Sequence, residues 1–172
     1  MRIVTLCSGN VARSVMLAYM LSDLAEAEGR AWRVRSAGTH VAEGQAMSAR
    51  TRRALESIPE LGEHRYGAHR SHQVTLADIA WADVILAAEL DHVRYVERLA
   101  GAAPVVQLGA FVTHAPRGET LADQLRALED EPDDGRLDIA DPAGGDQADY
   151  DACARELWTY ARRFVELVAS PG

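Results

Sequence analysis

The sequence predicts an α/β protein: a three-layer sandwich with a central parallel sheet of about four strands and helices on both faces. Short, strongly apolar segments alternate along the chain with amphipathic segments of helical period, which is typical of a parallel sheet covered on both sides. The chain has 172 residues, of which 48% are hydrophobic, and this is enough to bury a core in one domain. We therefore expect a single domain over residues 1–172.

The first half of the chain supplies two strands. Ile3, Val4 and Leu6 form an apolar, largely β-branched run of the kind found in buried strands. In the next strand, Trp32 and Val34 alternate with arginines. In chain order we expect strands at residues 3–6 and 32–37, and helices at 14–29, at 48–57 and, capped by Thr75, at 76–80.

The second half continues the alternation. We expect strands at residues 83–87 and 104–108, the latter ended by Gly109, and helices at 89–100 and 146–169. The apolar stripe expected on the last helix consists of Tyr150, Cys153, Leu157, Tyr160, Phe164, Leu167 and Val168. Residues 113–135 look inserted into this pattern. They hold a short helical patch and an acidic turn at 129–134, which we expect to be a solvated loop.

Composition limits the partners and the compartment. The net charge is −8, and every basic residue is an arginine. Nucleic-acid-binding proteins usually show the opposite charge balance, so we expect no nucleic-acid partner. No apolar run approaches the roughly 20 residues that span a membrane, and no signal peptide is evident, so we expect no membrane partner. The two cysteines, Cys7 and Cys153, do not suggest a disulfide framework, which indicates a reducing cytoplasm.

The loop between the first strand and the first helix carries the strongest chemical signal. Cys7 stands at the end of the strand, and Arg13 stands at the mouth of the helix. Such a loop can point successive backbone N–H groups into one hollow, and a guanidinium can grip two phosphate oxygens. Gly9 and Asn10 both tolerate the left-handed backbone that this hollow needs. The candidate phosphate-binding residues are Ser8, Gly9, Asn10, Val11, Ala12, Arg13 and Ser14.

Cys7 is the candidate nucleophile of this hollow. A thiol in a positive field loses its proton easily, and the thiolate is the reactive form. Ser14 could donate a hydrogen bond to the sulfur and hold it ready. The alternative is a cysteine buried for packing, which is how we interpret Cys153. The order of strand, Gly-Asn, serine and helix favours the nucleophilic interpretation for Cys7.

A nucleophile that attacks phosphorus needs an acid to protonate the leaving oxygen. The candidate is Asp141, because Pro142 stiffens the backbone beside it and two glycines follow closely. The alternative is a simple turn before the last helix, which Asp-Pro commonly marks. Asp138 and Asp134 are weaker candidates, since neither is followed by proline.

Taken together, these residues resemble the low-molecular-weight protein tyrosine phosphatases, over most of the chain. Residues 7–14 resemble the phosphate loop of that family, and Asp141 with Pro142 resembles the dipeptide that carries its general acid. Residues 36–39, 69–75 and 82–86 also resemble segments of the family. The combination is specific, although each piece alone is not.

The resemblance implies a phosphatase that hydrolyses a phosphomonoester, first of all of the phosphotyrosine type. Cys7 would form a cysteinyl-phosphate, and Asp141 would protonate the leaving oxygen and then activate water. Arg13 and the loop amides would hold the equatorial oxygens. The implied partners are a phosphorylated protein or a small phosphomonoester, with phosphate as the product, and neither a metal nor a cofactor is needed.

Several positions depart from the family. Ala12 stands where the family usually has a second cysteine, Val15 stands in place of a proline, and His72 stands in place of an arginine. Without the second cysteine, we expect oxidised Cys7 to lack a local rescue.

Other departures concern the substrate, and they conflict. Ala143, Gly144 and Gly145 follow Asp-Pro, where members acting on phosphotyrosine often carry aromatic residues. This version resembles bacterial members that include protein arginine phosphatases. Those tend to have threonine in place of Val11, which is closer to the tyrosine type. A small-molecule phosphatase of the same fold is a further alternative.

Three other functions compete with a phosphatase. An arsenate reductase on the same fold would need further cysteines to pass electrons, and this chain has just Cys153 beyond Cys7. A rhodanese-like sulfur carrier normally has its active loop late in the domain. A phosphate-binding module without turnover would not need Cys7, Arg13 and Asp141 together.

Overall fold

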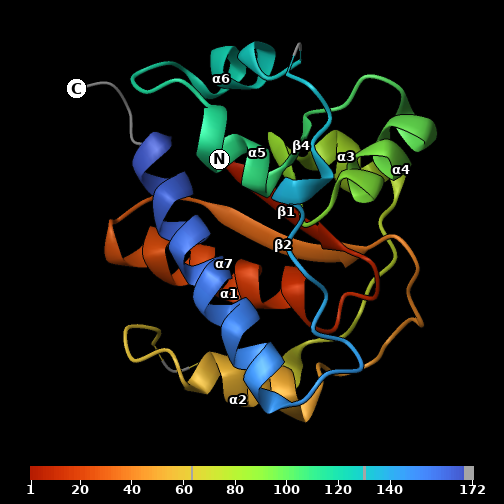
Figure 1. Cartoon of the computed structure of the whole chain (residues 1–172), viewed down its shortest axis with the longest axis vertical. Coiled ribbons are helices and arrows are strands. Elements are labelled where there is room, and N and C mark those ends of the chain that lie inside the picture. Colours follow the sequence, from red (N-terminus) through yellow and green to blue (C-terminus); the bar gives the residue numbers. More distant parts are fainter. Residues whose placement is uncertain (63, 130, 169–172) are drawn as a thin grey trace.

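Four parallel strands form the middle layer of the computed structural model, which describes residues 1–62, 64–129 and 131–168 (Figure 1). The strand order is β2-β1-β3-β4. The strands are β1 (Arg2–Cys7), β2 (Arg33–Gly38), β3 (Val84–Ala87) and β4 (Val105–Gln107). This confirms the central parallel sheet expected from the sequence, and helices on its two faces complete the expected three-layer sandwich.

Helices cover both faces of this sheet. They are α1 (Arg13–Ala27), α2 (Ala49–Glu56), α3 (Leu76–Trp81), α4 (Leu90–Ala100), α5 (Leu108–His114), α6 (Leu121–Ala127) and α7 (Gln147–Leu167). Two short 3₁₀ turns, η1 (Tyr66–Ala68) and η2 (Gly135–Leu137), complete the described elements. On one face, α1, α2, α5 and α7 share a core with the sheet; on the other, α3 and α4 do so (Figure 1).

Burial on both faces explains why β1 is an unbroken apolar run. Ile3 faces the core shared with α1 and α7, whereas Val4 and Leu6 face the core shared with α3 and α4. A strand covered on both sides has no solvent-facing positions to fill with polar side chains. The expected cap is also present: the side chain of Thr75 accepts a hydrogen bond from the Asp78 amide at the start of α3.

The end of β4 differs from the sequence prediction. The strand stops at Gln107, and Leu108 already begins α5, because Leu108, Phe111 and Val112 recur at helical spacing and are buried. Gly109 does not end a strand. It lies inside α5, where the absence of a side chain lets the backbone of Leu137 pack closely.

The expected insertion is partly helical. The short patch is α6, and its Gln124 is fully buried, with Nε2 donating to the carbonyl oxygens of Pro116 and Leu167. That residues 113–135 are an insertion stays a prediction. Two expectations fall outside the described residues: Asp130 in the acidic turn, and Ala169 at the end of the last helix.

On the last helix, five members of the expected stripe are buried, whereas Tyr160 and Val168 are partly buried.

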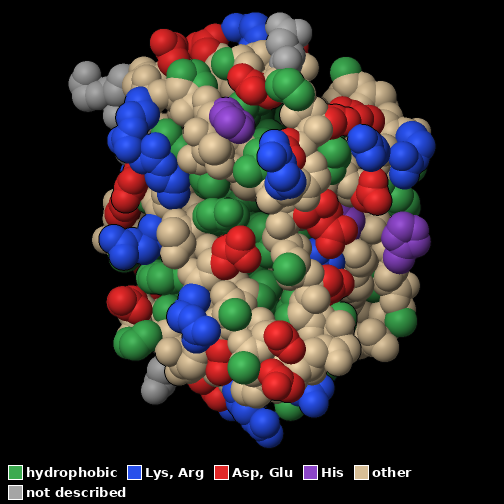
Figure 2. Space-filling model, in the orientation of Figure 1, with side chains coloured by type: hydrophobic (Ala, Val, Ile, Leu, Met, Phe, Trp, Pro, Cys, Tyr) green, Lys and Arg blue, Asp and Glu red, His purple; other side chains and the backbone are tan. Residues whose placement is uncertain are grey.

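Charged side chains of both signs occur on the surface. Over the described residues of the face drawn in Figure 2, arginines and acidic side chains are interspersed rather than gathered into one basic surface. Within residues 1–62, 64–129 and 131–168, no helix combines the length and the apolar character needed to cross a bilayer.

Parallel pairing brings the strand ends together. Cys7 pairs with Gly38 of β2, and Leu6 pairs with Ala87 of β3. The carboxyl ends of three strands therefore meet at one edge of the sheet, which is where open α/β sheets bind their ligands. The loop of residues 7–14 lies at that edge.

Candidate active site

The loop between β1 and α1 is shaped by Asn10. Among the described residues, Asn10 is the one non-glycine with a positive φ, 52°. Its side chain bonds in two directions: Oδ1 accepts from the amide of His72 at 2.9 Å, and Nδ2 donates to Ser14 Oγ at 2.9 Å. Of the two residues that tolerate this backbone, Asn10 adopts it, whereas Gly9 is not among the positive-φ glycines. The asparagine alone makes the left-handed turn.

Two segments of the chain bond to this loop: one follows β2, and the other precedes α3. His69 Nε2 donates to the carbonyl oxygen of Asn10 at 2.8 Å, and burial lowers the pKa of His69, which favours its neutral form. The amides of Thr39 and His40 donate to the carbonyl oxygens of Cys7 and Ser8, each at 2.9 Å. These contacts account for two of the segments that resemble the phosphatase family, residues 36–39 and 69–75.

Cys7 is buried, and its sulfur lies 3.0 Å from Ser14 Oγ. The hydroxyl of Ser14 accepts from Asn10 Nδ2, so its own proton is free to point at the sulfur. The hydrogen-bond chain therefore runs from Asn10 through Ser14 to Cys7, with the Ser14 hydroxyl as the donor to the sulfur. This is the role that the sequence predicts for Ser14.

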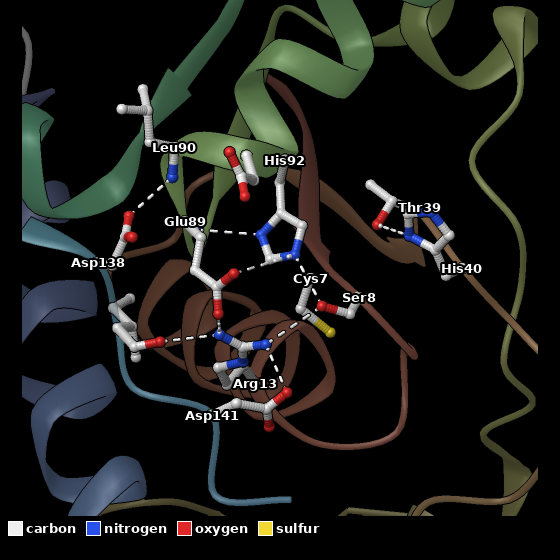
Figure 3. A network of polar contacts seen from close by, with 12 residues as sticks. Cys7, Ser8, Arg13, Thr39, His40, Glu89, Leu90, His92, Asp138 and Asp141 are labelled. Carbon is white, nitrogen blue, oxygen red and sulfur yellow. Dashed lines mark hydrogen bonds and ion pairs between the residues drawn. The ribbon is translucent and has the colours of Figure 1, made fainter. Parts of the chain in front are cut away.

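Arg13 is buried, at 1% exposure, with its guanidinium between Glu89 and Asp141 (Figure 3). Nη2 donates to Asp141 Oδ2 at 2.7 Å, and Nη1 donates to a carboxylate oxygen of Glu89 and to the carbonyl oxygen of Ile139 at 2.8 Å. Burial acts to lower the pKa of Arg13. The hydrogen bond that Arg13 donates to Glu89 and the charges of Asp141 and Glu89 outweigh this, so the pKa lies above its ordinary value and Arg13 stays charged.

Asp141 lies within this network and also makes the local turn that was its alternative interpretation. Its Oδ1 accepts from the amide of Ala143 at 3.0 Å, while Oδ2 contacts Arg13. The other two candidate acids, Asp138 and Asp134, make different contacts. Asp138 accepts from the amide of Leu90 at 2.7 Å and from a side-chain amide, and Asp134 caps η2. The structure therefore brings Asp141, and neither of its rivals, to Arg13.

The sequence pattern does not single out two residues of this network, Glu89 and His92. His92 is buried, with Nε2 lying 2.9 Å from Ser8 Oγ. One signal was available, since Glu89 follows closely after a buried parallel strand, where functional side chains gather. Among the described residues, no cluster of three His, Cys, Asp or Glu side chains is placed to hold a metal ion.

Two hollows lie near these elements. A cavity of about 410 Å³ is bordered by Asp141, Pro142 and, on α7, Cys153 and Glu156. A larger groove of about 880 Å³ runs along β4 between α4 and α6, and the catalytic candidates do not line it. Burial raises the pKa of Cys153 to about 12, so its thiol stays protonated, as expected for a packing residue.

Peroxide inactivation of Cys7 is expected to be poorly reversed by thiol reductants. Ala12 offers no thiol beside Arg13, and the protonated thiol of Cys153 is a poor nucleophile, so a sulfenic acid at Cys7 proceeds to the irreversible sulfinic acid. Hydrolysis of an aryl phosphate after peroxide and then dithiothreitol measures the recovery. The matched variant Ala12→Cys should recover more; recovery of most activity without that change would contradict the prediction.

Comparison with known proteins agrees with this geometry. The family model described as low molecular weight phosphotyrosine protein phosphatase matches residues 2–170. A protein-arginine-phosphatase from Geobacillus stearothermophilus is 31% identical over 167 residues, which cover 96% of this chain and 94% of that protein.

Solved structures show the same similarity. An arginine phosphatase from Geobacillus stearothermophilus has a TM-score of 0.74 at 29% identity, covering 96% of this chain and 90% of that one. A low molecular weight protein tyrosine phosphatase from T. tengcongensis has a TM-score of 0.77 at 24% identity, covering 96% and 98%, which supports the fold alone. Because the family model spans nearly the whole chain, this protein belongs to the low molecular weight phosphotyrosine protein phosphatase family.

Proposed function

We propose that this phosphatase acts with Cys7 as the nucleophile, Asp141 as the acid and then the base, and Arg13 as the group that holds the phosphoryl oxygens. The observation that supports this most is that the three side chains lie together at the end of β1, where Arg13 pairs with Asp141 and its charge acts on Cys7 (Figure 3). A phosphoryl group there would meet a guanidinium, the loop amides and the sulfur at the same time.

In the first step, the sulfur of Cys7 attacks phosphorus, an S–P bond forms, and the bond to the leaving atom breaks. The leaving atom takes a proton from Asp141. In the second step, water attacks phosphorus while Asp141 takes one of its protons, the S–P bond breaks, and phosphate leaves with the thiolate restored. Arg13 Nη2, now bonded to Asp141, would turn to the phosphoryl oxygens and release the acid for these transfers.

The acid-quenched reaction with a ³²P-labelled aryl phosphate tests this mechanism. Label is expected on a peptide that contains Cys7, and the bond should be a thiophosphate ester, stable in acid and cleaved by iodine. Label on any other side chain, or turnover with no covalent intermediate under rapid quench, would contradict the proposal.

The first candidate substrate is a phosphotyrosine side chain of a protein. Val11 gives the loop an apolar side chain, and His40, whose amide bonds to Ser8, packs its ring against Tyr95 with centroids 5.6 Å apart. This aromatic pair adjoins the loop, whereas the segment after Asp141 supplies no aromatic wall. An aryl leaving group would pack against such a rim.

The second candidate is a phosphoarginine side chain, and two observations favour it. The 31% identical relative is a protein-arginine-phosphatase, and two carboxylates, Glu89 and Asp141, border the guanidinium of Arg13. Carboxylates beside the reacting group suit a cationic guanidinium leaving group.

Values of kcat/KM for a phosphotyrosine peptide, a phosphoarginine peptide and a sugar phosphate, measured side by side, separate the candidates. We expect kcat/KM to be higher for the phosphotyrosine peptide than for the other two substrates. Faster hydrolysis of phosphoarginine would establish the second candidate, and faster hydrolysis of the sugar phosphate would exclude both. We also propose the reducing cytoplasm as the compartment, which the free thiols of Cys7 and Cys153 support.

A further inference from the structure

The hydroxyl of Ser8 lies between two nitrogen groups. His92 Nε2 is 2.9 Å from Ser8 Oγ, and Arg13 Nη2 is 3.4 Å from it (Figure 3). Within the part of the chain that the structure describes, these are the two hydrogen-bond partners of the hydroxyl. An arginine N–H always donates, so the direction of the histidine contact decides where the serine proton points.

The other ring nitrogen of His92 settles that direction. Nδ1 lies 3.1 Å from the backbone N–H of Glu89, which can only donate, so Nδ1 is an acceptor. The ring is buried, and burial lowers the pKa of His92 against the opposing charge of Glu89, which favours the neutral ring. A neutral ring with an accepting Nδ1 carries its proton on Nε2. Nε2–H therefore donates to Ser8 Oγ.

With donors on both sides, the Ser8 oxygen has used its lone pairs, and its own proton needs an acceptor elsewhere. Ser8 directly follows Cys7 in the loop, and both residues belong to the group of side chains around Arg13 (Figure 3). We infer that the hydroxyl of Ser8 donates a hydrogen bond to the phosphoryl group above Cys7, and that His92 is the positioning residue that sets its direction. This inference rests on the proposed function for the identity of the anion.

The first experiment compares Ser8→Ala with Ser8→Thr, which keeps the hydroxyl. Ser8→Ala should lower kcat for an aryl phosphate by about 10- to 100-fold, the usual effect of losing a hydrogen bond to a charged group, with little change in KM. The inhibition constant for vanadate, which mimics the transition state, should rise by a similar factor. Ser8→Thr should stay within a few fold of the original protein, and Ser22→Ala is the matched control.

The second experiment removes the donor of His92 and keeps the helix cap. Asp78 and Asp149 occupy the same position at the starts of α3 and α7, and each accepts from its cap amide. An asparagine has the length of these side chains, so His92→Asn keeps the bond to Glu89 but does not reach Ser8. We expect about a tenfold loss of kcat/KM, rescued in part by His92→Gln, with His114→Ala as the control.

A double-mutant cycle separates positioning from packing. If His92 acts through Ser8, His92→Asn should have no further effect on kcat/KM in the Ser8→Ala protein. An equal loss in both backgrounds would show a structural role and overturn the assignment of His92. An unchanged kcat and vanadate constant in Ser8→Ala would overturn that of Ser8.

Tungstate binding to Cys7→Ser, measured by calorimetry, distinguishes failure of this inference from failure of the proposed function, because it needs no turnover. Adding Ser8→Ala to that protein should weaken tungstate binding about tenfold or more. That result would support the Ser8 donor even if the labelling experiment found no intermediate on Cys7. Unchanged tungstate binding would overturn the Ser8 donor even in an active enzyme.

Discussion

Cys7→Ser will lower the hydrolysis of an aryl phosphate by about 10⁴-fold or more, because a serine hydroxyl stays protonated where a thiol ionises. The contact with Ser14 and the nearby charge of Arg13 remain in this variant, but neither makes an alcohol acidic enough to react. Steady-state kcat at several pH values measures the loss. The variant should keep the fold, since the substitution is nearly isosteric at a buried position.

The matched control for this change is Cys153→Ala. That cysteine lies on α7 with its pKa raised to about 12, so removing its sulfur should leave kcat within about twofold. The small cavity should cost about 1 kcal/mol of unfolding free energy, which chemical denaturation would measure. The assignment of the nucleophile would be wrong if Cys7→Ser kept a few per cent of activity, or if Cys153→Ala abolished it.

Asp141→Asn will lower kcat by about 10²- to 10⁴-fold for a substrate with a poor leaving group. Asparagine can still accept from the amide of Ala143, so the local turn is kept, but it has no proton to give to the leaving oxygen. The fall in kcat should therefore be larger for phenyl phosphate than for 4-nitrophenyl phosphate, whose leaving group departs without protonation. Comparing kcat for these two substrates measures this difference.

The control for Asp141 is Asp134→Asn, which changes an acid of the same region that caps η2 and pairs with Arg136. It should leave kcat unchanged for both substrates. If Asp141→Asn slowed the two substrates equally, its effect would come through the position of Arg13 rather than through proton transfer. A loss smaller than about tenfold for phenyl phosphate would remove Asp141 from the acid role.

The parts of the site that lie close together in the chain were open to prediction from the sequence. Cys7, Arg13 and Ser14 follow one strand and open one helix, so their spacing alone brings them to one loop. Of the two residues that tolerate a left-handed backbone, Asn10 adopts it because it bonds to three neighbours, and two of these contacts come from residues 69 and 72, far along the chain. Those bonds stabilise a backbone conformation that asparagine tolerates and glycine does not need to supply.

The boundary between β4 and α5 also depends on contacts between residues that are far apart in the sequence. A short apolar run predicts burial but does not distinguish a strand from the first turn of a buried helix. Leu108 is buried in either case, and α5 was decided by the packing of Phe111 against Phe164 of α7, with ring centroids 5.1 Å apart. That contact joins residues far apart in the sequence.

The sequence by itself determined the layered architecture and the loop of residues 7–14 with its cysteine, because periodicity and spacing are properties of neighbouring residues. The tertiary structure alone decided that Glu89 and Asp141 hold Arg13 from two sides, across separations of 76 and 128 positions. It also decided that His92 reaches Ser8. The physical reason is that parallel strands bring their carboxyl ends to one edge, and the side chains that meet there depend on strand order and register.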